Sequence, residues 1–239
     1  MMQAQTVIST QFPAVHPIVR IPGPLHDALP ALSVAMAPLN AYGTRVRFAA
    51  GETIFNEGDV ATKTYRVLCG AVRLCKHMSD GRRQIVEFIL AGDFFGLMQL
   101  PEYAFTAEAV NDVVVVSYPR PQIERLGGAS CGFRNELFAL LSTQLLGMHQ
   151  HLVMVGRQSA KERVAGFLLK LVNRADASDG DTLELPMSRQ DMADYLGLTI
   201  ETVCRELSAL KKARVLSAPD LHSIAVHDVV RLETIASGE

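Results

Sequence analysis

Glu201 and Arg205 lie four residues apart, so on a helix their side chains project from one face, a turn apart. A guanidinium can donate to two acceptors of guanine, and a carboxylate can accept from the amino group of cytosine. Ile200 and Cys204 flank this pair and offer apolar contact. These residue types at this spacing favour recognition of base edges in a DNA groove, and we expect all four residues to contact bases.

The segment that carries this pair is predicted to be a helix from Thr199 to Lys212. Thr199 is a typical N-cap, because its hydroxyl can accept from an amide of the first turn. Val203, Leu207 and Leu210 recur at helical spacing and form one apolar face. The base-reading pair then lies at the exposed start of a helix that is anchored by its other face.

The residues just before this helix indicate a second, shorter helix. Ser188 followed three residues later by Asp191 is a capping pattern. Ala193 is small enough for close helix packing, and Gly197 allows a tight turn. Two short helices joined by a glycine turn make a helix-turn-helix unit. One departure is Glu206, where such units often carry an apolar residue.

The charge balance limits what this unit can bind. The chain has 239 residues, of which 49% are hydrophobic and 20% charged, and its formal net charge is -2. This is enough for two modest domains, but it is not the basic balance of a nonspecific nucleic-acid binder. DNA contact must come from local cations, which are Arg189, Arg205, Lys211, Lys212 and Arg214. Acidic neighbours weaken that patch: Asp191, Asp194, Glu201 and Glu206.

The cysteines and the N-terminus indicate the compartment. The four cysteines, Cys69, Cys75, Cys131 and Cys204, show no metal-ligand pairing, so we expect no metal site. The first ten residues do not form a signal peptide, and no apolar run is long enough to span a bilayer. We therefore expect a cytoplasmic protein without a membrane partner.

The N-terminal half has a different pattern. Residues 1–30 read as an extended lead-in, and Leu32–Leu39 as a short helix. From Thr44 to Tyr118, short alternating segments are separated by glycines, which predicts an antiparallel β-roll or barrel. The expected strands are 45–48, 53–55, a pair within 65–75 broken at Gly70, 84–90, and the β-branched run 113–116.

Three segments of this half resemble the β-roll of the CRP/FNR superfamily of bacterial transcription regulators: Gly51–Asp59, Gly70–Leu74 and Ala91–Gly96. The likeness continues through the helix-turn-helix. It implies an α+β fold with a cyclic-nucleotide-binding-like antiparallel β-roll, a long dimerisation helix and a C-terminal winged helix-turn-helix. The expected division is 1–30 for the N-terminal segment, 31–130 for the β-roll, 131–157 for the dimerisation helix and 158–239 for the DNA-binding domain.

The resemblance also bears on cofactors. In cyclic-nucleotide-binding members a Glu follows the residue that matches Gly96, and an Arg holds the phosphate, but this chain has Leu97 and no Arg within Glu102–Ala107. Members with an iron–sulfur cluster carry N-terminal cysteines, and none precedes Cys69 here. We therefore expect neither cofactor. A sensor gated by haem or a small metabolite in the β-roll is the alternative.

Two segments, Phe105–Ala109 and Leu198–Val203, resemble the FixK-type branch. That resemblance implies a regulator that is active as made, binds inverted repeats of the TTGAT type, works with RNA polymerase, and activates genes for microaerobic respiration and denitrification. It also implies phosphate contacts from Ser188, Arg189, Gln190, Thr199 and Thr202.

A long amphipathic helix is predicted from Phe133 to Val155, with a seam for a partner helix. The seam residues are Leu137, Leu141, Leu145, Met148, Leu152 and Val155. A helix-turn-helix protein needs two copies to read successive major grooves, so we expect a parallel homodimer. A capping box at Ser159–Glu162 starts the next helix, and segments 215–217 and 223–226 predict the hairpin of a wing.

Three further sequence features concern other kinds of chemistry: a serine nucleophile, a histidine metal site and a redox-active cysteine. Ser130 lies in a Gly-x-Ser-x-Gly sequence, as in the nucleophile elbow of serine hydrolases, but a helix and not a parallel strand is predicted before it. His149 and His151 lie two apart on a helix and face different ways, so they are poor joint metal ligands. Cys204, beside the DNA, is a candidate redox switch.

Overall fold

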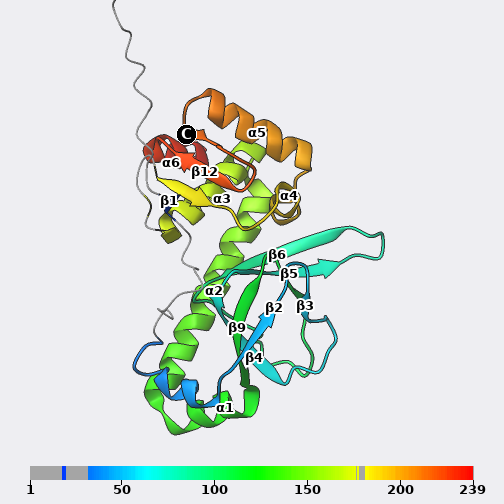
Figure 1. Cartoon of the computed structure of the whole chain (residues 1–239), viewed down its shortest axis with the longest axis vertical. Coiled ribbons are helices and arrows are strands. Elements are labelled where there is room, and N and C mark those ends of the chain that lie inside the picture. Colours follow the sequence, from blue (N-terminus) through cyan, green and yellow to red (C-terminus); the bar gives the residue numbers. More distant parts are fainter. Residues whose placement is uncertain (1–17, 20–31, 176, 178–180, 239) are drawn as a thin grey trace, which may run out of the picture.

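The computed structural model describes residues 18–19, 32–175, 177 and 181–238. A β-rich body lies alongside one long helix, α2 (Cys131–Arg157), and a body built mainly from helices lies at the end of that helix (Figure 1). The order of elements is that of an antiparallel β-roll followed by α2 and a C-terminal helix-turn-helix. The predicted α+β fold class is confirmed.

The β-roll contains two four-stranded sheets in which neighbouring strands pair antiparallel. The first sheet has the order β2 (Thr44–Phe48), β9 (Val113–Pro119), β4 (Lys63–Cys69) and β7 (Phe94–Phe95). The second has the order β3 (Thr53–Phe55), β8 (Thr106–Ala109), β5 (Ala71–His77) and β6 (Arg83–Leu90). Apolar side chains from both sheets, among them Val67, Val72 and Val115, are fully buried in a shared core.

The turn between β4 and β5 requires glycine. Gly70 has a φ of +82°, and a Cβ at this position would lie 2.4 Å from the carbonyl oxygen of Asp112. A side chain would meet backbone there as well as adopting the left-handed region. The break predicted at Gly70 is therefore the tight connection of two strands.

A 3-10 helix, η1 (Ala37–Tyr42), precedes the roll, although the sequence predicted a helix over Leu32–Leu39. The helix starts later because Pro38 has no amide hydrogen and fits in the first turn of a helix and not in its interior. After the roll, α1 (Arg120–Ala129) leads into α2, and Phe133 at the start of α2 is fully buried against Leu39 and Tyr118.

The C-terminal body consists of α3 (Ala160–Ala175), β10 (Thr182–Glu184), α4 (Arg189–Leu196), α5 (Ile200–Lys212), β11 (Leu216–Ser217), β12 (Ser223–Val226) and α6 (Val229–Ser237). The predicted capping box at the start of α3 is present: the Glu162 amide donates to Ser159 Oγ, and the Ser159 amide donates to a Glu162 carboxylate oxygen. β11 and β12 pair antiparallel and form the predicted wing.

Four strands were not predicted: β7 and β8 in the β-roll, and β10 and β1 in the C-terminal body. β10 lies beside β12, and β1 (Ile18–Val19) pairs parallel with β10, so the wing sheet has the order β1-β10-β12-β11. The rest of the N-terminal segment that was predicted to be extended lies outside the described residues.

Candidate nucleic-acid interface

The first helix of the helix-turn-helix is fixed at its start by reciprocal hydrogen bonds. The Asp191 amide donates to Ser188 Oγ (3.1 Å), and the Ser188 amide donates to Asp191 Oδ2 (3.1 Å), which is the predicted capping box. α4 ends at Gly197, whose φ of +63° turns the chain toward α5. Short polar side chains and one glycine therefore set the angle between the two helices.

α5 begins where the sequence placed it. Thr199 caps the helix by accepting from the Thr202 amide (3.3 Å). Val203, Leu207 and Leu210 are buried, and they share a core with Met192 and other residues of α4. Burying each such side chain is worth about 1.5–3 kcal/mol, so this face holds α5 rigidly and leaves the opposite face to solvent.

The exposed face of α5 carries the predicted reading residues Glu201, Cys204 and Arg205, and α5 lies at the outer edge of its body in Figure 1. A hydrogen bond from its own backbone amide, and then one from Thr199, hold the pKa of Glu201 below its ordinary value. Glu201 is therefore a carboxylate at neutral pH, and a carboxylate accepts hydrogen bonds without donating any.

Arg205 makes an ion pair that the sequence did not predict. Its Nε lies 3.2 Å from Glu206 Oε1, while 68% of the Arg205 side chain is exposed and only 15% of that of Glu206. Ion pairs with an exposed partner contribute about 0–1 kcal/mol, so Arg205 can leave this contact at little cost. Glu206, which stands where such units often carry an apolar residue, therefore supplies a partner for the Arg205 guanidinium when no DNA is bound.

Two predicted contact residues are partly turned inward. Ile200 is half-buried and packs against the core of the helix-turn-helix. Arg189 is also half-buried, and its Nη1 donates to Met192 Sδ (3.3 Å). Burial lowers the pKa of Arg189, opposed by Cys204 and Asp220. A contact from Arg189 to a phosphate would need a different side-chain rotamer.

The other predicted phosphate contacts lie at the two helix starts. Gln190 is exposed, and its Nε2 donates to Asp194 Oδ1 (2.7 Å). The hydroxyls of Thr199 and Thr202 lie 3.2 Å apart at the start of α5, and Ser188 Oγ is engaged in the capping box. Helix starts present free amides and a positive dipole end, which favours phosphate there.

A cluster of ion pairs joins α4 to the β-roll, and the sequence did not predict it. We call it the interdomain cluster: Arg73, Arg83, Glu108, Asp191 and Asp194. Arg73 reaches Glu108 (2.8 Å) and Asp191 (3.0 Å), while Arg83 reaches Asp191 (2.5 Å) and Asp194 (2.7 Å). The side chains of this cluster are only 6–19% exposed. Asp191 and Asp194, which the sequence placed among the charges that weaken the basic patch, are thus neutralised by cations of the roll.

Aromatic rings extend this contact between the two bodies. Phe88 of β6 lies 5.2 Å from Tyr195 of α4 and 6.1 Å from Phe167 of α3, between ring centroids. The ring of His151 on α2 lies 4.3 Å from that of Tyr195. Aromatic pairs at such distances contribute about 0.5–1.5 kcal/mol beyond their buried area. The recognition unit is therefore held against the roll and α2 by both charge and packing.

The apolar seam of α2 is largely exposed in the single chain. Leu145, Met148 and Leu152 are 53%, 55% and 70% exposed, and Leu141 is 36% exposed. Leu137 is half-buried and packs with the cluster around Phe133, and Val155 is half-buried. Phe138, which was not among the predicted residues, is 70% exposed. Phe138 and not Leu137 continues the three-four spacing of the exposed seam.

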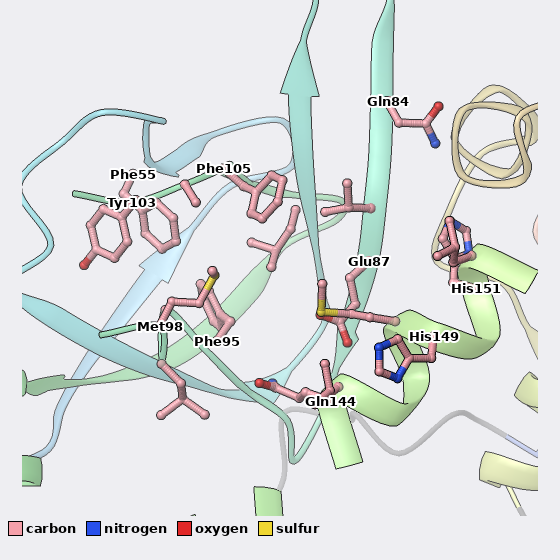
Figure 2. Close-up of a pocket in the computed structure, with 18 of the residues that line it drawn as sticks. Phe55, Gln84, Glu87, Phe95, Met98, Tyr103, Phe105, Gln144, His149 and His151 are labelled. Atoms are coloured by element: carbon pink, nitrogen blue, oxygen red, sulfur yellow. The ribbon is translucent and has the colours of Figure 1, made fainter. Parts of the chain in front are cut away.

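A cavity of about 480 Å³ lies between the β-roll and α2. In Figure 2 the rings of Phe55, Phe95 and Tyr103 lie on the side of the roll, and Gln144 and His149 come from α2. Its lining is mostly apolar, with two carboxylates, Glu87 and Glu102. The cavity also borders three seam residues, Leu145, Met148 and Leu152.

The guanidinium that lines this cavity is already engaged. Arg120 is 7% exposed, and its two terminal nitrogens donate to the carbonyls of Leu100 (2.7 Å) and Gly96 (2.9 Å). Leu97 follows Gly96 in the cavity wall. Only Nε of Arg120 is left without a hydrogen-bond partner, so the two terminal nitrogens that would bind a phosphate side by side are both occupied.

The Gly-x-Ser-x-Gly sequence does not form a nucleophile elbow. Ser130 lies between α1 and α2, and its Oγ accepts from the Phe133 amide (3.3 Å) as the N-cap of α2. The elbow requires a strand before the serine, and α1 occupies that place. Cys69 and Cys75 are buried in strands, and Cys131 and Cys204 are exposed. Among the described residues, no helix combines the length and apolar character that a membrane crossing requires.

Comparison with known proteins agrees with this anatomy. The family model for the cyclic nucleotide-binding domain matches residues 45–128, and the one for the Crp-like helix-turn-helix domain matches residues 162–235. The nitrogen fixation regulation protein FixK of Bradyrhizobium diazoefficiens is 41% identical over 82% of this chain and 83% of its own length. That of Rhizobium meliloti is 38% identical over 84% and 90%.

A solved structure adds to these relatives. The structure of FixK2 from Bradyrhizobium japonicum is similar with a TM-score of 0.77 at 38% identity, over 81% of this chain and 96% of that one. The relatives are named as regulators, and the helix-turn-helix is the region of the fold that explains such a role.

Proposed function

We propose that this chain, which belongs to the CRP/FNR superfamily and is a FixK-type transcription regulator and not an enzyme, acts as a homodimer. The DNA site that we propose for it is an inverted repeat of the TTGAT type. The observation that carries this proposal is the exposed start of α5, where Glu201 and Arg205 project from a helix anchored by its buried face. The genes it activates are those for microaerobic respiration and denitrification, in concert with RNA polymerase.

Base recognition rests on two charged groups. Arg205 donates to the guanine of the TTGAT-type site and Glu201 accepts from the opposite cytosine, because these are the bases whose major-groove edges suit a guanidinium and a carboxylate. Ile200 and Cys204 contact the bases by packing. Ser188, Arg189, Gln190, Thr199 and Thr202 hold phosphates, which position the protein without specifying the sequence.

The exposed seam of α2 supports the homodimer. Its side chains Leu141, Leu145, Met148 and Leu152 lie in solvent in the single chain, and a contiguous apolar patch of this kind marks an interface. Two parallel copies of α2 would place the recognition helices about 34 Å apart. Under this proposal residues 1–30 form the lead-in, 31–130 the roll, 131–157 the dimerisation helix and 158–239 the DNA-binding domain.

The cavity supports action without a cyclic nucleotide. A phosphate buried there would not find the terminal nitrogens of Arg120 available, because they hold backbone carbonyls, and the carboxylate of Glu102 would repel it. The interdomain cluster gives the recognition unit a fixed support that needs no ligand.

A ligand-gated regulator is the second candidate, and the same cavity favours it. A mostly apolar cavity of about 480 Å³ is large enough for a small metabolite. Absorption spectra and native mass spectrometry of the protein as purified distinguish the two functions. A haem band or a bound mass supports the ligand-gated protein, and their absence from a DNA-binding preparation supports the effector-free one.

Fluorescence anisotropy on effector-free protein tests the proposed function. The expected result is tight binding to a TTGAT-type palindrome and at least about a thousandfold weaker binding to a scrambled duplex of equal length at the same salt. Equal affinity for both duplexes would overturn the proposed sequence recognition.

Cys204 is proposed as a redox switch of the same surface. Its side chain is exposed beside Arg205, and a sulfenic acid or disulfide there would change the reading face. Peroxide should weaken DNA binding by the wild type and spare Cys204→Ser, while Cys131→Ser, which removes the other exposed thiol, behaves as wild type. Equal losses in wild type and Cys204→Ser would exclude the switch at this residue.

A further inference from the structure

Three side chains with metal-ligand atoms converge on one face of the second sheet of the β-roll. Cys75 and His77 lie two residues apart on β5, so both project from the same face of the strand. Glu108 of β8 lies opposite Arg73, which is on that face too. Among the described residues, these three form the group of His, Cys and acidic side chains whose ligand atoms all lie within 4.8 Å of one another.

The distances match those between ligands of a tetrahedral metal ion. Cys75 Sγ lies 3.6 Å from His77 Nε2, and His77 Nε2 lies 3.1 Å from Glu108 Oε1. Around a tetrahedral Zn²⁺ with ordinary bond lengths, sulfur and nitrogen ligands lie about 3.5 Å apart, and nitrogen and oxygen ligands about 3.3 Å apart. A metal ion could therefore be accommodated with only small shifts of these side chains.

The surroundings orient the carboxylate. Arg73 donates through Nε to Glu108 Oε2 (2.8 Å), which leaves Oε1 directed at His77. Partners of this kind fix ligand orientation in metal sites. His77 is 53% exposed, so a cation can enter from solvent, and water can fill the fourth position.

The charge of the neighbourhood suits a divalent cation. Arg73 and Arg83 face Glu108 from β5 and β6, and Asp191 and Asp194 pair with them from α4. With a neutral thiol and imidazole, these five charged groups carry one net negative charge. A divalent cation that displaces the thiol proton adds one positive charge and makes the cluster neutral.

We propose that Cys75, His77 and Glu108 bind a thiophilic divalent cation of the Zn²⁺ class, with water as the fourth ligand. Sulfur and imidazole ligands select Zn²⁺ and its neighbours over Mg²⁺ and Ca²⁺. The proposal depends on the ligand geometry within the β-roll and is independent of DNA recognition.

Metal binding should release a proton. A cysteine thiol has an ordinary pKa of about 8.5, so a thiol without a metal is mainly protonated at neutral pH. A coordinated sulfur is a thiolate. About one proton per metal should therefore leave, and a weakly buffered titration with a pH indicator measures it.

Co²⁺ titration of the full-length, chelator-treated and reduced protein is the direct test. We expect uptake of one Co²⁺ per chain, with sulfur-to-cobalt charge-transfer absorption and the strong visible bands of tetrahedral Co²⁺, both of which Zn²⁺ abolishes. Cys75→Ser should remove the charge-transfer band. His77→Ala should weaken binding by at least about tenfold, the loss that even an outer-shell change can cause.

Two side chains outside the proposed site, Cys69 and His149, offer matched controls. Cys69→Ser removes another buried strand cysteine, and His149→Ala removes another exposed histidine, and both should bind Co²⁺ as the wild type does. His77→Ala decides the test if Cys75→Ser fails to fold, because His77 is half-exposed. No stoichiometric uptake, or unchanged spectra and affinity in His77→Ala, would show that the three side chains are only hydrogen-bonded to one another.

Discussion

At the scale of single residues, the proposed sequence recognition depends on Arg205, whose only ion pair among the described residues is with Glu206 at the surface. Arg205 is 68% exposed and pairs with Glu206, so only a weak contact must break before the guanidinium meets a base. The fork of an arginine then offers two parallel donors to one guanine, which a lysine cannot reproduce.

Arg205→Ala should cost about 1–3 kcal/mol of binding free energy on the specific site and relax the preference at one base pair. Anisotropy titrations against a set of duplexes with single base-pair changes measure both effects. Lys161→Ala, which removes an exposed cation at the start of α3, should leave the preference unchanged. An equal loss on specific and random DNA would mean that Arg205 contacts phosphate and not base.

Glu87 gives a pH-dependent prediction at the same scale. Burial, opposed by Lys170, raises the pKa of its carboxyl to about 7 in the folded chain. A raised folded pKa gives stability that is complete below the ordinary value near 4.5 and is lost as the pH rises to about 7. Glu87→Gln should therefore stabilise the protein by about 1–3 kcal/mol at pH 8 and much less at pH 5.

Urea unfolding of both proteins at the two pH values measures this difference. Glu124→Gln, a substitution at an exposed position of α1, serves as the control and should show no such trend. A gain for Glu87→Gln that is equal at pH 5 and pH 8 would contradict the raised pKa.

Residue types predicted the caps and the buried faces correctly because these depend on neighbours in sequence. Ser188 with Asp191, and the buried Val203, followed from spacing alone. The inward orientation of Arg189 did not follow from spacing, because it depends on the contact between its guanidinium and the Met192 sulfur. The convergence of Cys75, His77 and Glu108 was missed because Glu108 comes 31 residues after His77, although a Cys-x-His pair on a strand shares one face.

At the scale of elements, helical periodicity predicted α2, but not which of the apolar side chains near its start is exposed. Leu137 and Phe138 are both apolar, and only the packing of the β-roll decides between them: Leu137 turns toward the cluster around Phe133, and Phe138 remains in solvent. β10 and β1 were missed because they are very short and pair only across long stretches of sequence.

Leu152→Glu should convert the proposed homodimer into monomers and abolish tight binding to the palindrome. Leu152 is 70% exposed in the single chain, so the substitution leaves the fold of the monomer intact, but it would bury an unpaired charge between two helices. Sedimentation velocity measures the assembly state. Gln150→Glu places the same charge on an exposed position off the seam and should remain dimeric. A dimeric Leu152→Glu would place the interface elsewhere.

At the scale of the whole molecule, the interdomain cluster holds the recognition unit in place. Arg73 and Asp191 are 118 residues apart in sequence, so no local pattern indicates their contact. The side chains of Arg73 in β5 and Arg83 in β6 are only 15% and 19% exposed where they pair with α4. Removing one of the two arginines would leave an aspartate carboxylate with less compensating charge in a largely buried environment.

Arg83→Ala should lower the thermal midpoint and weaken DNA binding, because Asp191 and Asp194 lose a shared cation, at a cost of about 1–3 kcal/mol. Arg82→Ala is the matched control: the neighbouring side chain is 82% exposed and pairs only with Asp80 in the described structure. A double-mutant cycle of Arg83→Ala with Asp194→Ala measures the coupling directly. Equal thermal midpoints and DNA affinities of Arg82→Ala and Arg83→Ala would show that the interdomain cluster does not hold the recognition unit in place.

The spacing of the two half-sites is the most direct test of the central claim, that two copies of the α5 start read one DNA face. Affinity of the effector-free protein is measured for TTGAT-type palindromes that contain zero, five or ten extra central base pairs. The account predicts that five extra base pairs, half a helical turn, reduce binding to the level of scrambled DNA. Affinity that does not depend on spacing would contradict it.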